Sequence, residues 1–218
     1  MKIALVIPAY NEEQSIKKIV SNALKYGDVI VVNDGSADTT STLANEAGAF
    51  VVDHIENLGY DQALKTGMHV ALELKYEFAI TLDADGQHDT EIIKEFILEF
   101  GNHSDLVLGY RDKTQRFAEC LFAIIGNLFW GIKDPLCGMK GYNLGMLRLA
   151  RNFDTYGSIG TELAIRAAKS GYKISFVPIK TAVRLGKSRF GGGLRPNLRI
   201  LRAMFLAFWK APKIKNGK

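Results

Sequence analysis

Two carboxylates, Asp83 and Asp85, stand one residue apart in the segment DADGQH, directly after an apolar run. Their like charges repel, so a site that holds both close together needs a compensating cation. Mg²⁺ and Mn²⁺ prefer oxygen ligands and take one or two carboxylates together with substrate phosphates, so this pair, helped by Gln87, is a candidate metal site. Taken alone, an Asp-x-Asp segment is more often a simple turn or helix cap at the end of a strand.

Polar residues also follow the other apolar runs in the first half of the chain. Asp34 and Ser36 follow the run VIVVN, and Asn57 and Gly59 follow AFVVD. The first run, IALVIP, leads into a segment made of Pro8, Ala9, Tyr10, Asn11 and Glu12. In an α/β sheet, ligands bind beyond the carboxyl ends of the strands, so we expect these segments to share one edge. Each segment alone fits a turn, but four together favour a binding site.

The spacing of the apolar residues predicts the elements that hold these side chains. Short β-rich runs alternate with segments of 3.6-residue periodicity, which is typical of β-α-β units and a mainly parallel sheet. We expect strands over 3–8, 29–33, 49–53, 78–83 and 105–109, and helices over 12–24, 38–47, 61–74 and 90–100. In the second half we expect helices near 117–130 and 159–170, a turn-rich segment over 134–142 and a strand over 173–180. The predicted fold class is α/β.

Composition excludes several classes of protein. Of the 218 residues, 47% are hydrophobic and 23% charged, which is ordinary for a globular domain. The two cysteines lack metal-binding spacing and indicate a reducing compartment. Neither GxGxxG nor GxxxxGK[ST] occurs, so hydride transfer and ATP hydrolysis lose support. The longest apolar stretch, 117–132, is shorter than the roughly 20 residues that span a bilayer, so we expect no transmembrane helix.

The charge of the chain is unevenly distributed, because Glu162 is the last acidic residue. Residues 163–218 carry 14 Lys and Arg and no acidic residue, which predicts an anionic partner. The end of the chain has the pattern of a basic amphipathic helix, with an apolar stripe of Leu194, Leu198, Leu201, Phe205 and Phe208 beside a stripe of Arg195, Arg199 and Arg202. Aromatic residues on the apolar side favour a lipid surface over nucleic acid. A helix that simply docks on the domain is an equal alternative.

Seven motifs, taken in order, resemble those of a known family: PAYNE (8–12), VNDGSADTT (32–40), NLGYDQALKTG (57–67), DADGQH (83–88), GYR (109–111), DPLCGMKGY (134–142) and RLGKSRFG (184–191). Over residues 1–192 the chain resembles glycosyltransferase family 2, especially its dolichol-phosphate mannosyltransferase and polyprenyl-phosphate glycosyltransferase branch. The resemblance implies a GT-A-like sandwich with a mainly parallel central sheet, a nucleotide-sugar donor, Mg²⁺ or Mn²⁺, and inversion at the anomeric carbon. We expect 1–192 to be the glycosyltransferase domain and 193–218 a basic helix and tail.

The resemblance also implies a role for individual residues where the motifs match. The donor nucleotide would be held by Pro8, Tyr10, Asn11, Glu12, Asp34, Ser36, Asp83 and Ala84. The metal would be held by Asp83, Asp85 and Gln87. The acceptor phosphate or the donor diphosphate would be held by Arg111, Arg184, Ser188 and Arg189. The expected catalytic residues are Asp85, Arg111, Arg184 and Asp134, of which Asp134 is the only candidate general base.

The chemistry of the acceptor favours a lipid phosphate. A phosphate monoester is already anionic at neutral pH and needs no general base, whereas a sugar hydroxyl does. We therefore expect an enzyme that transfers a sugar to a polyprenyl phosphate such as dolichyl or undecaprenyl phosphate. It would act in the cytoplasm at the inner face of the membrane, in peripheral contact through the C-terminal helix, without a nucleic-acid partner. Two alternatives are transfer to a saccharide hydroxyl in envelope polysaccharide synthesis and a non-catalytic scaffold that binds nucleotide sugars.

Overall fold

The computed structural model describes residues 1–86, 89–111, 117–150, 157–180 and 194–214. At its centre is a seven-stranded sheet with the order β3-β2-β1-β4-β6-β5-β7. The strands are β1 (Ile3–Ala9), β2 (Asp28–Asn33), β3 (Phe50–Asp53), β4 (Phe78–Thr81), β5 (Leu106–Arg111), β6 (Lys140–Asn143) and β7 (Ile174–Ile179). The helices are α1 (Ile16–Ala23), α2 (Thr40–Glu46), α3 (Tyr60–Glu73), α4 (Ile93–Gly101), α5 (Phe117–Trp130), α6 (Leu144–Ala150), α7 (Ile159–Lys169) and α8 (Leu194–Lys210), with a short 3₁₀ helix, η1 (Thr90–Ile92), before α4.

The strand pairing confirms the prediction of a mainly parallel sheet. Strands β3, β2, β1 and β4 pair in parallel, as do β5 and β7. Strand β6 lies between β4 and β5 and runs antiparallel to both. The carboxyl ends of β1, β2, β3, β4 and β5 therefore share one edge of the sheet, and the amino end of β6 enters at that same edge.

The prediction of a turn-rich segment over 134–142 is wrong for residues 140–142, which belong to β6. The glycine that suggests a turn has a packing role here: a Cβ on Gly141 would lie 2.7 Å from the ring of Phe100 in α4. Helix α6, which we did not predict, begins immediately after β6. The side chain of Asn143 accepts a hydrogen bond from Gly145 N (2.8 Å), so it caps the first turn of that helix.

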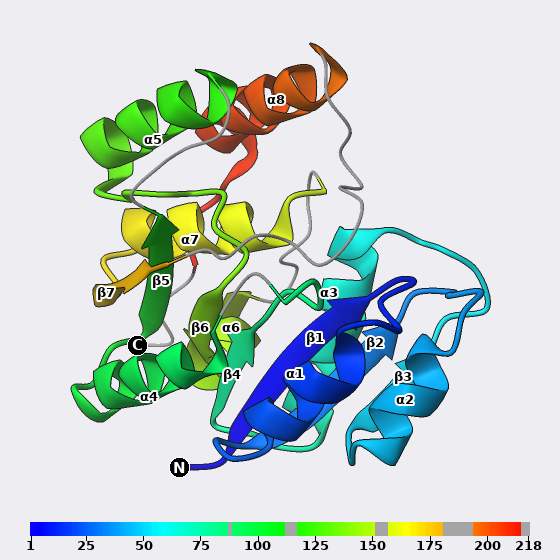
Figure 1. The fold of residues 1–218 in the computed structure, drawn as a ribbon. Helices are drawn as coiled ribbons and strands as arrows, with labels where there is room; N and C mark the ends of the chain where they lie inside the picture. The colour runs from blue at the N-terminus through cyan, green and yellow to red at the C-terminus, as the bar shows by residue number, and fades with distance from the viewer. Residues whose placement is uncertain (87–88, 112–116, 151–156, 181–193, 215–218) are drawn as a thin grey trace.

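Both faces of the sheet are covered, which is why β1 is apolar along its whole length. Ala4 and Val6 pack into a core with α3, α6 and α7, whereas Leu5 and Ile7 pack into a second core with α1, α2 and α4. Figure 1 shows these two groups of helices on opposite sides of the strands. The result is an α/β sandwich with a mainly parallel central sheet, as the family resemblance implies.

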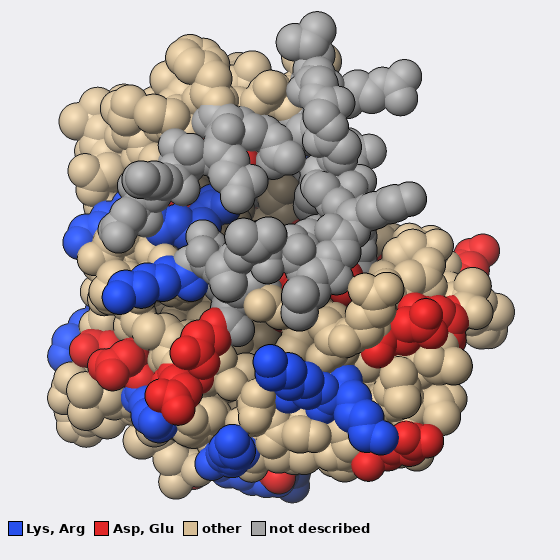
Figure 2. Space-filling model, in the orientation of Figure 1, with Lys and Arg blue, Asp and Glu red and all other residues tan. Residues whose placement is uncertain are grey.

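Helices α5 and α8 lie side by side in a further layer beyond α7 (Figure 1). The predicted C-terminal helix is confirmed. It packs inward through the buried small residues Ala203 and Ala207 together with the partly buried Ile200 and Met204. Of its predicted apolar stripe, Leu198 and Phe205 point outward, whereas Phe208 contacts α5. Figure 2 shows the outer surface of α5, at the upper left, without charged side chains. The outward apolar residues, each at least 60% exposed and together called the α5–α8 face, are Phe117, Ile124, Leu128, Phe129, Leu198, Phe205 and Trp209.

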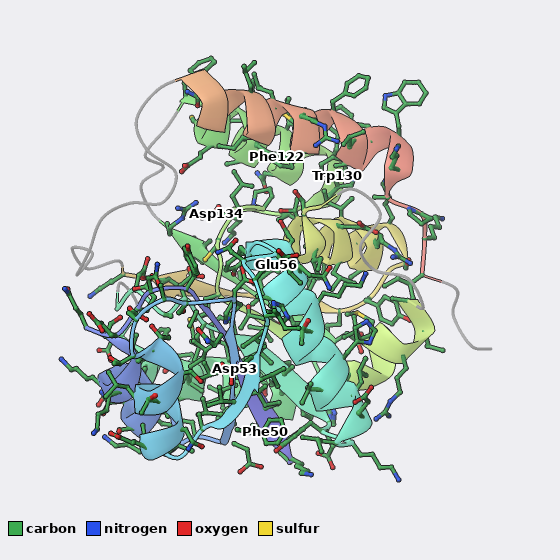
Figure 3. All side chains as sticks on the ribbon, turned by 90° about the vertical axis from the view of Figure 1, so that its right-hand side faces the viewer. Phe50, Asp53, Glu56, Phe122, Trp130 and Asp134 are labelled. Atoms are coloured by element: carbon green, nitrogen blue, oxygen red, sulfur yellow. The ribbon has the colours of Figure 1, made fainter. Side chains whose placement is uncertain are left out.

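Aromatic rings join these two helices at their ends. The ring of Phe208 lies 5.2 Å from that of Phe129 and 4.8 Å from that of Trp130. Phe122 and Trp130 lie on the side of this layer that faces the rest of the chain (Figure 3). Within the described segments, no helix is both long and apolar enough to cross a membrane.

Candidate functional site

The polar ends of β1 and β2 are joined by hydrogen bonds into one unit. Asn11 N donates to Ser36 Oγ (2.9 Å), and Ala37 N donates to Asn11 Oδ1 (2.9 Å). Asn11 has a φ of 52°, a conformation that asparagine tolerates better than most residues. Glu12 N donates to Thr40 Oγ1 (2.8 Å). The two predicted donor-binding segments therefore meet, with Pro8 and Tyr10 on the chain that leads into them.

The end of β4 is attached to the same unit. Ser15 Oγ donates to the carbonyl oxygen of Ala84 at 2.6 Å and lies 3.4 Å from Glu12 Oε2. Ala84 and Asp85 are both buried. The segment that carries the two carboxylates is thus held against the beginning of α1. In Figure 3 the run from Phe50 through Asp53 to Glu56 gives the direction of β3 toward this edge, and Asp134 lies between the edge and the α5–α8 layer.

Asp34 stabilises the loop that follows β3. Its carboxylate accepts hydrogen bonds from Leu58 N (2.9 Å) and Gly59 N (2.8 Å), and Oδ1 lies 2.7 Å from His54 Nδ1. The other ring nitrogen of His54 lies 3.0 Å from Thr66 Oγ1. Sequence reasoning did not connect His54 with Asp34, because no motif links a strand end to a histidine beyond the next strand. The contacts with Leu58, Gly59 and His54 fix the carboxylate of Asp34 at the edge of the site. That Asp34 binds a nucleotide stays a prediction.

Asp83 is held between two elements that are distant in sequence. Tyr60 Oη, at the start of α3, donates to Asp83 Oδ1 at 3.2 Å. On the other side, Gly138 packs directly against the carboxylate, and a Cβ at this position would overlap Asp83 Oδ2. Burial, followed by the charge of Asp83, raises the pKa of Tyr60 well above its usual value, so this hydroxyl stays a hydrogen-bond donor. The side chain of Asp83 is therefore oriented before any ligand arrives.

The donor set at this edge fits Mg²⁺ or Mn²⁺. Asp83 and Asp85 carry hard carboxylate oxygens one residue apart, and these ions need only one or two protein carboxylates because substrate phosphates and water complete the shell. Among the described residues no group of three or more His, Cys, Asp or Glu side chains forms a metal centre. Gln87, the third predicted ligand, lies outside the described residues. The present residues thus suit a metal that is shared with a phosphorylated substrate.

Arg111 and Asp134 form a bidentate ion pair at the end of β5. Arg111 Nε donates to Asp134 Oδ2 (2.8 Å), and Arg111 Nη2 donates to Asp134 Oδ1 (3.1 Å). Burial acts to raise the pKa of Asp134, but the hydrogen bonds and charge of Arg111 outweigh it and hold this pKa below its ordinary value. Glu119 of α5 also lies 3.6 Å from Arg111 Nη2. A carboxylate with such a low pKa is a weak base, so this geometry favours a positioning role for Asp134.

Sequence reasoning missed Lys140, the first residue of β6. Its side chain is buried, and its Nζ donates to the carbonyl oxygen of Cys137. The adjacent Tyr142 hydroxyl is also buried and has no hydrogen-bond partner among the described atoms. The sequence shows Lys140 only as the basic residue of DPLCGMKGY. Because a lysine in a turn-rich segment is normally exposed, this pattern does not predict a buried side chain. The antiparallel strand β6 is what brings it into the interior beside the carboxylates.

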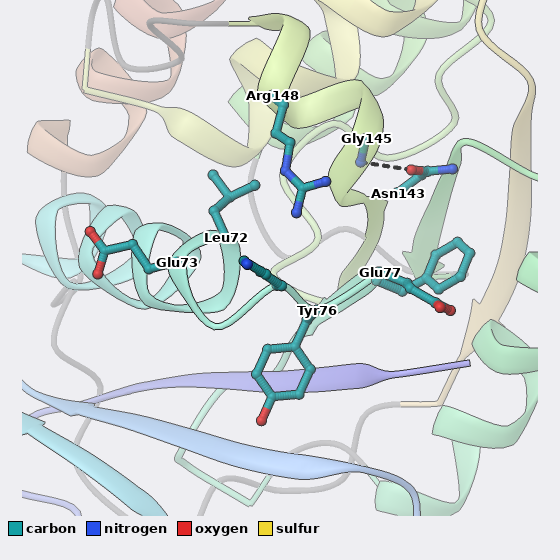
Figure 4. A pocket seen from close by; sticks show the side chains of 9 residues that line it. Leu72, Glu73, Tyr76, Glu77, Asn143, Gly145 and Arg148 are labelled. Atoms are coloured by element: carbon teal, nitrogen blue, oxygen red, sulfur yellow. Dashed lines mark hydrogen bonds between the residues drawn. The ribbon is translucent and has the colours of Figure 1, made fainter.

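Three further predicted residues lie outside the described part of the chain, and these are Arg184, Ser188 and Arg189. Their phosphate-binding roles stay predictions. A separate shallow pocket of about 710 Å³ lies at the opposite edge of the sheet, where β4 begins. Figure 4 shows Tyr76, Glu77 and Arg148 around it. None of the predicted site residues lines this pocket, so the carboxyl edge remains the candidate site.

Comparison with known proteins identifies the family of the chain. The family model described as Glycosyl transferase family 2 matches residues 4–118. The chain is 30% identical to a UDP-N-acetylglucosamine–dolichyl-phosphate N-acetylglucosaminyltransferase of Methanococcus voltae, over 82% of this chain and 85% of the relative. It is 28% identical to an undecaprenyl-phosphate mannosyltransferase of Micrococcus luteus over the full length of both chains.

The fold is also similar to that of a solved glycosyltransferase. Glucosyl-3-phosphoglycerate synthase from Mycobacterium tuberculosis, crystallised with Mn²⁺, UDP-glucose and phosphoglyceric acid, superposes with a TM-score of 0.75 at 19% identity. The superposition covers 99% of this chain and 81% of the synthase. The family match spans more than half of the chain, and the predicted sandwich is observed. The chain therefore belongs to glycosyl transferase family 2 and is a glycosyltransferase of the GT-A fold.

Proposed function

We propose that this glycosyltransferase moves a sugar from a nucleotide-diphosphate sugar to a polyprenyl phosphate, in a metal-dependent reaction that inverts the anomeric carbon. The strongest support is that carboxylates and an arginine lie at the same edge of the sheet. Asp83 and Asp85 are the carboxylates, and Arg111 is the arginine on the next parallel strand end. The segment 134–140 contacts both, through Asp134 and through Gly138.

The donor would lie over the joined ends of β1, β2 and β4. Asn11 and Ser36 fix the shape of this surface, and Asp34 fixes the loop beside it. Asp83 and Asp85, with Gln87, would hold Mg²⁺ or Mn²⁺ on the donor diphosphate. When bound, such an ion neutralises charge on the departing nucleoside diphosphate.

The acceptor would be a phosphate because the described part of the site offers a cation, Arg111, while its candidate base, Asp134, is a weak one. An arginine side chain can donate hydrogen bonds to phosphate oxygens, and Asp134 fixes the orientation of Arg111 through Nε and Nη2. Since the ion pair lowers the pKa of Asp134, this carboxylate is poorly suited to remove a proton from a sugar hydroxyl. A phosphate monoester needs no such step. The names of the two relatives, which act on dolichyl and undecaprenyl phosphate, support the same class of acceptor.

The test is release of nucleoside diphosphate from a panel of UDP- and GDP-sugars, with Mn²⁺ or Mg²⁺, with and without a short-chain polyprenyl phosphate. We expect release with at least one donor that depends on the lipid phosphate. Release that depends instead on a saccharide would reject the proposed acceptor. Binding of a nucleotide sugar without turnover under any condition would favour a scaffold.

We further propose that the α5–α8 face contacts the membrane that contains the acceptor, on its cytoplasmic side. Phe205 and Trp209 lie one turn apart on the outside of α8, with Arg202 exposed between Leu198 and Phe205. Lys210 and Lys213 follow at the end of the helix and are exposed. Exposed aromatic and aliphatic side chains beside basic ones suit the interface of an anionic bilayer.

This contact can be tested by sedimentation with vesicles that contain an anionic phospholipid. Substitution of Phe205 and Trp209 together by serine should reduce the bound fraction several-fold. Substitution of Leu98 by serine is the matched control, since Leu98 is an exposed apolar residue on α4, far from the α5–α8 face. Equal binding of both variants and the unsubstituted chain would contradict the proposed membrane contact.

A further inference from the structure

His54 is a largely buried histidine that the proposed reaction does not use. It lies one residue beyond the end of β3, and its backbone N donates to the carbonyl oxygen of Asn33 in β2 (2.9 Å). The side chain of His54 is 10% exposed and that of Asp34 is 4% exposed. A polar side chain that is withdrawn from water needs hydrogen-bond partners within the protein, and His54 has one at each ring nitrogen. Nδ1 lies 2.7 Å from Asp34 Oδ1, and Nε2 lies 3.0 Å from Thr66 Oγ1.

The direction of the hydrogen bond between His54 and Asp34 follows from the other contacts of the carboxylate. Asp34 also accepts from the backbone N atoms of Leu58 and Gly59, so the carboxylate is an acceptor on both of its oxygens. Nδ1 of His54 therefore carries a hydrogen and donates to Oδ1. The hydroxyl of Thr66 can either donate or accept, so it suits Nε2 in both charge states of the ring. The ring of His54 is thus held at both nitrogens, and it holds Asp34.

The carboxylate of Asp34 in turn holds the segment 56–60, which leads from β3 into α3. It does so through the two hydrogen bonds that it accepts from backbone N atoms of this segment. Gly35, the next residue, lets the segment approach closely, because a Cβ at this position would lie 2.5 Å from the carbonyl carbon of Glu56. In Figure 3, Glu56 lies beyond Asp53, the last residue of β3, in the direction of the site edge. The residues after β2 therefore fix the course of this segment.

Tyr60, the last residue of the segment, connects it to the carboxylate pair after β4. The preceding residue is Gly59, whose N donates to Asp34 Oδ2 (2.8 Å), and the hydroxyl of Tyr60 donates to Asp83 Oδ1 (3.2 Å). One short stretch of backbone thus contacts the aspartate after β2 and positions a donor for the aspartate after β4. A displacement of this stretch would move the Tyr60 hydroxyl. Since His54 holds Asp34, it influences both the proposed nucleotide end and the proposed metal end of the site.

We propose that His54 is a positioning residue for donor binding, because its hydrogen bond to Asp34 keeps the segment 56–60 in the geometry that holds the nucleotide sugar and its metal. The inference rests on the proposed function, which places the donor over the ends of β1, β2 and β4. His54 acts through Asp34 and not on the reacting atoms. Its loss should therefore weaken binding of the donor and leave binding of the acceptor, which we place at Arg111, unchanged.

The test separates the two ring nitrogens of His54. In His54→Asn the amide nitrogen takes the approximate place of Nδ1 and can still donate to Asp34, whereas in His54→Gln it takes the approximate place of Nε2 and reaches Thr66 instead. His54→Phe keeps an aromatic ring of similar shape and removes both contacts.

Two measurements are made on each variant. Binding of UDP and of GDP with Mn²⁺ is titrated by calorimetry, and KM values for the nucleotide sugar and for the polyprenyl phosphate are obtained from nucleoside diphosphate release. We expect His54→Gln and His54→Phe to bind the nucleotide about tenfold more weakly and to raise the donor KM by a similar factor, with the acceptor KM within about twofold of its original value. His54→Asn should stay close to the unsubstituted protein in both measurements.

Tyr76→Phe is the matched control for a loss of stability alone. The Tyr76 hydroxyl donates to Asp28 Oδ2 (2.8 Å), so this substitution also removes a hydrogen bond to an aspartate, but at the opposite end of β2. It should lower the Tm without changing either KM. The inference would be overturned if His54→Asn and His54→Gln had the same nucleotide affinity, if the acceptor KM rose as much as the donor KM, or if His54→Gln and His54→Phe both failed to fold. If the unsubstituted protein bound neither UDP nor GDP, the proposed function itself would be rejected, and the inference with it.

Discussion

At the residue scale, the central feature is a carboxylate whose neighbours leave it no freedom. Asp83 is fixed by Tyr60 on one side and by the backbone of Gly138 on the other. The sequence predicts the carboxylates because two aspartates after an apolar run are visible in one short segment. It does not predict Gly138 as their neighbour, since that contact depends on the pairing of β4 with β6.

Gly138→Ala should therefore impair the site more than it impairs the fold. The added methyl group overlaps Asp83 Oδ2, so the carboxylate has to move. We expect at least a tenfold loss of kcat/KM, which corresponds to about 1.4 kcal/mol of transition-state stabilisation. Gly101→Ala is the matched control, because a Cβ at this position meets nothing within 4 Å. Equal activity of the two variants would show that the position of Asp83 is unimportant.

Asp85→Asn should abolish turnover if the carboxylate pair holds the metal. The amide keeps the size of the side chain but removes one of the two charges that attract the cation. We expect nucleoside diphosphate release to fall by at least a hundredfold while the melting temperature stays within a few degrees, and calorimetric titration with Mn²⁺ to show weaker binding. Release at the unsubstituted rate would contradict the assignment of Asp85.

The Arg111–Asp134 pair should make stability depend on pH on the acid side. In the folded protein the pKa of the Asp134 carboxyl lies below its ordinary value of 3.8. The ionised carboxylate therefore stabilises the fold at pH values above 3.8, and this stability is lost as the pH falls through the lowered pKa of the folded state. Asp134→Asn should cost about 3 kcal/mol of unfolding free energy near pH 7. Urea unfolding of both proteins between pH 3 and 7 should give curves that converge toward the acid end. A constant difference over this range would contradict the assigned pKa shift.

The two thiols should differ in reactivity. Burial raises the pKa of Cys137 to about 11, whereas Cys120 is exposed on α5. A thiol reagent at pH 8 should therefore modify Cys120 in the folded chain and both cysteines after unfolding. Rapid modification of Cys137 in the folded state would show that the segment 134–140 opens frequently.

At the element scale, the strongly periodic first half is well predicted, and the second half less so. Strands β1, β2 and β4 fall where their apolar runs predict them, because a strand buried on both faces leaves a continuous apolar signal. The sequence does not predict strand β6, because Gly141 suggests a turn although it serves packing. It does not predict α6, because this helix follows β6 without a loop. Helix α8 is predicted as a helix, but its orientation is not.

The orientation of α8 has a direct consequence for stability. Ala207 is fully buried in the contact of α8 with the core, whereas Leu198 is 63% exposed on the opposite side. Ala207→Leu should destabilise the protein by about 1–3 kcal/mol through overpacking. Leu198→Ala should change the unfolding free energy by less than about 0.5 kcal/mol. The reverse order of these two effects, measured by urea unfolding, would mean that α8 packs through the side that carries Leu198.

At the scale of the whole molecule, the parts of the site come from both halves of the chain. The first half provides Asp83 and the proposed donor surface, and the second half provides Asp134 and Gly138 in the segment that leads into the antiparallel strand β6. The basic C-terminal region follows, and its last described helix turns aromatic side chains outward on the same layer as α5. This arrangement places the α5–α8 face beyond the site edge, as Asp134 in Figure 3 indicates.

The central claim is transfer of a sugar to a lipid phosphate, and the most direct measurement follows the sugar itself. The protein, Mn²⁺, a polyprenyl phosphate and a nucleotide sugar with a radiolabelled sugar are incubated, and the label is extracted into an organic solvent. We predict that label enters the organic phase with the unsubstituted protein and not with Asp85→Asn. Label that stays in the aqueous phase while nucleoside diphosphate is released would contradict the claim.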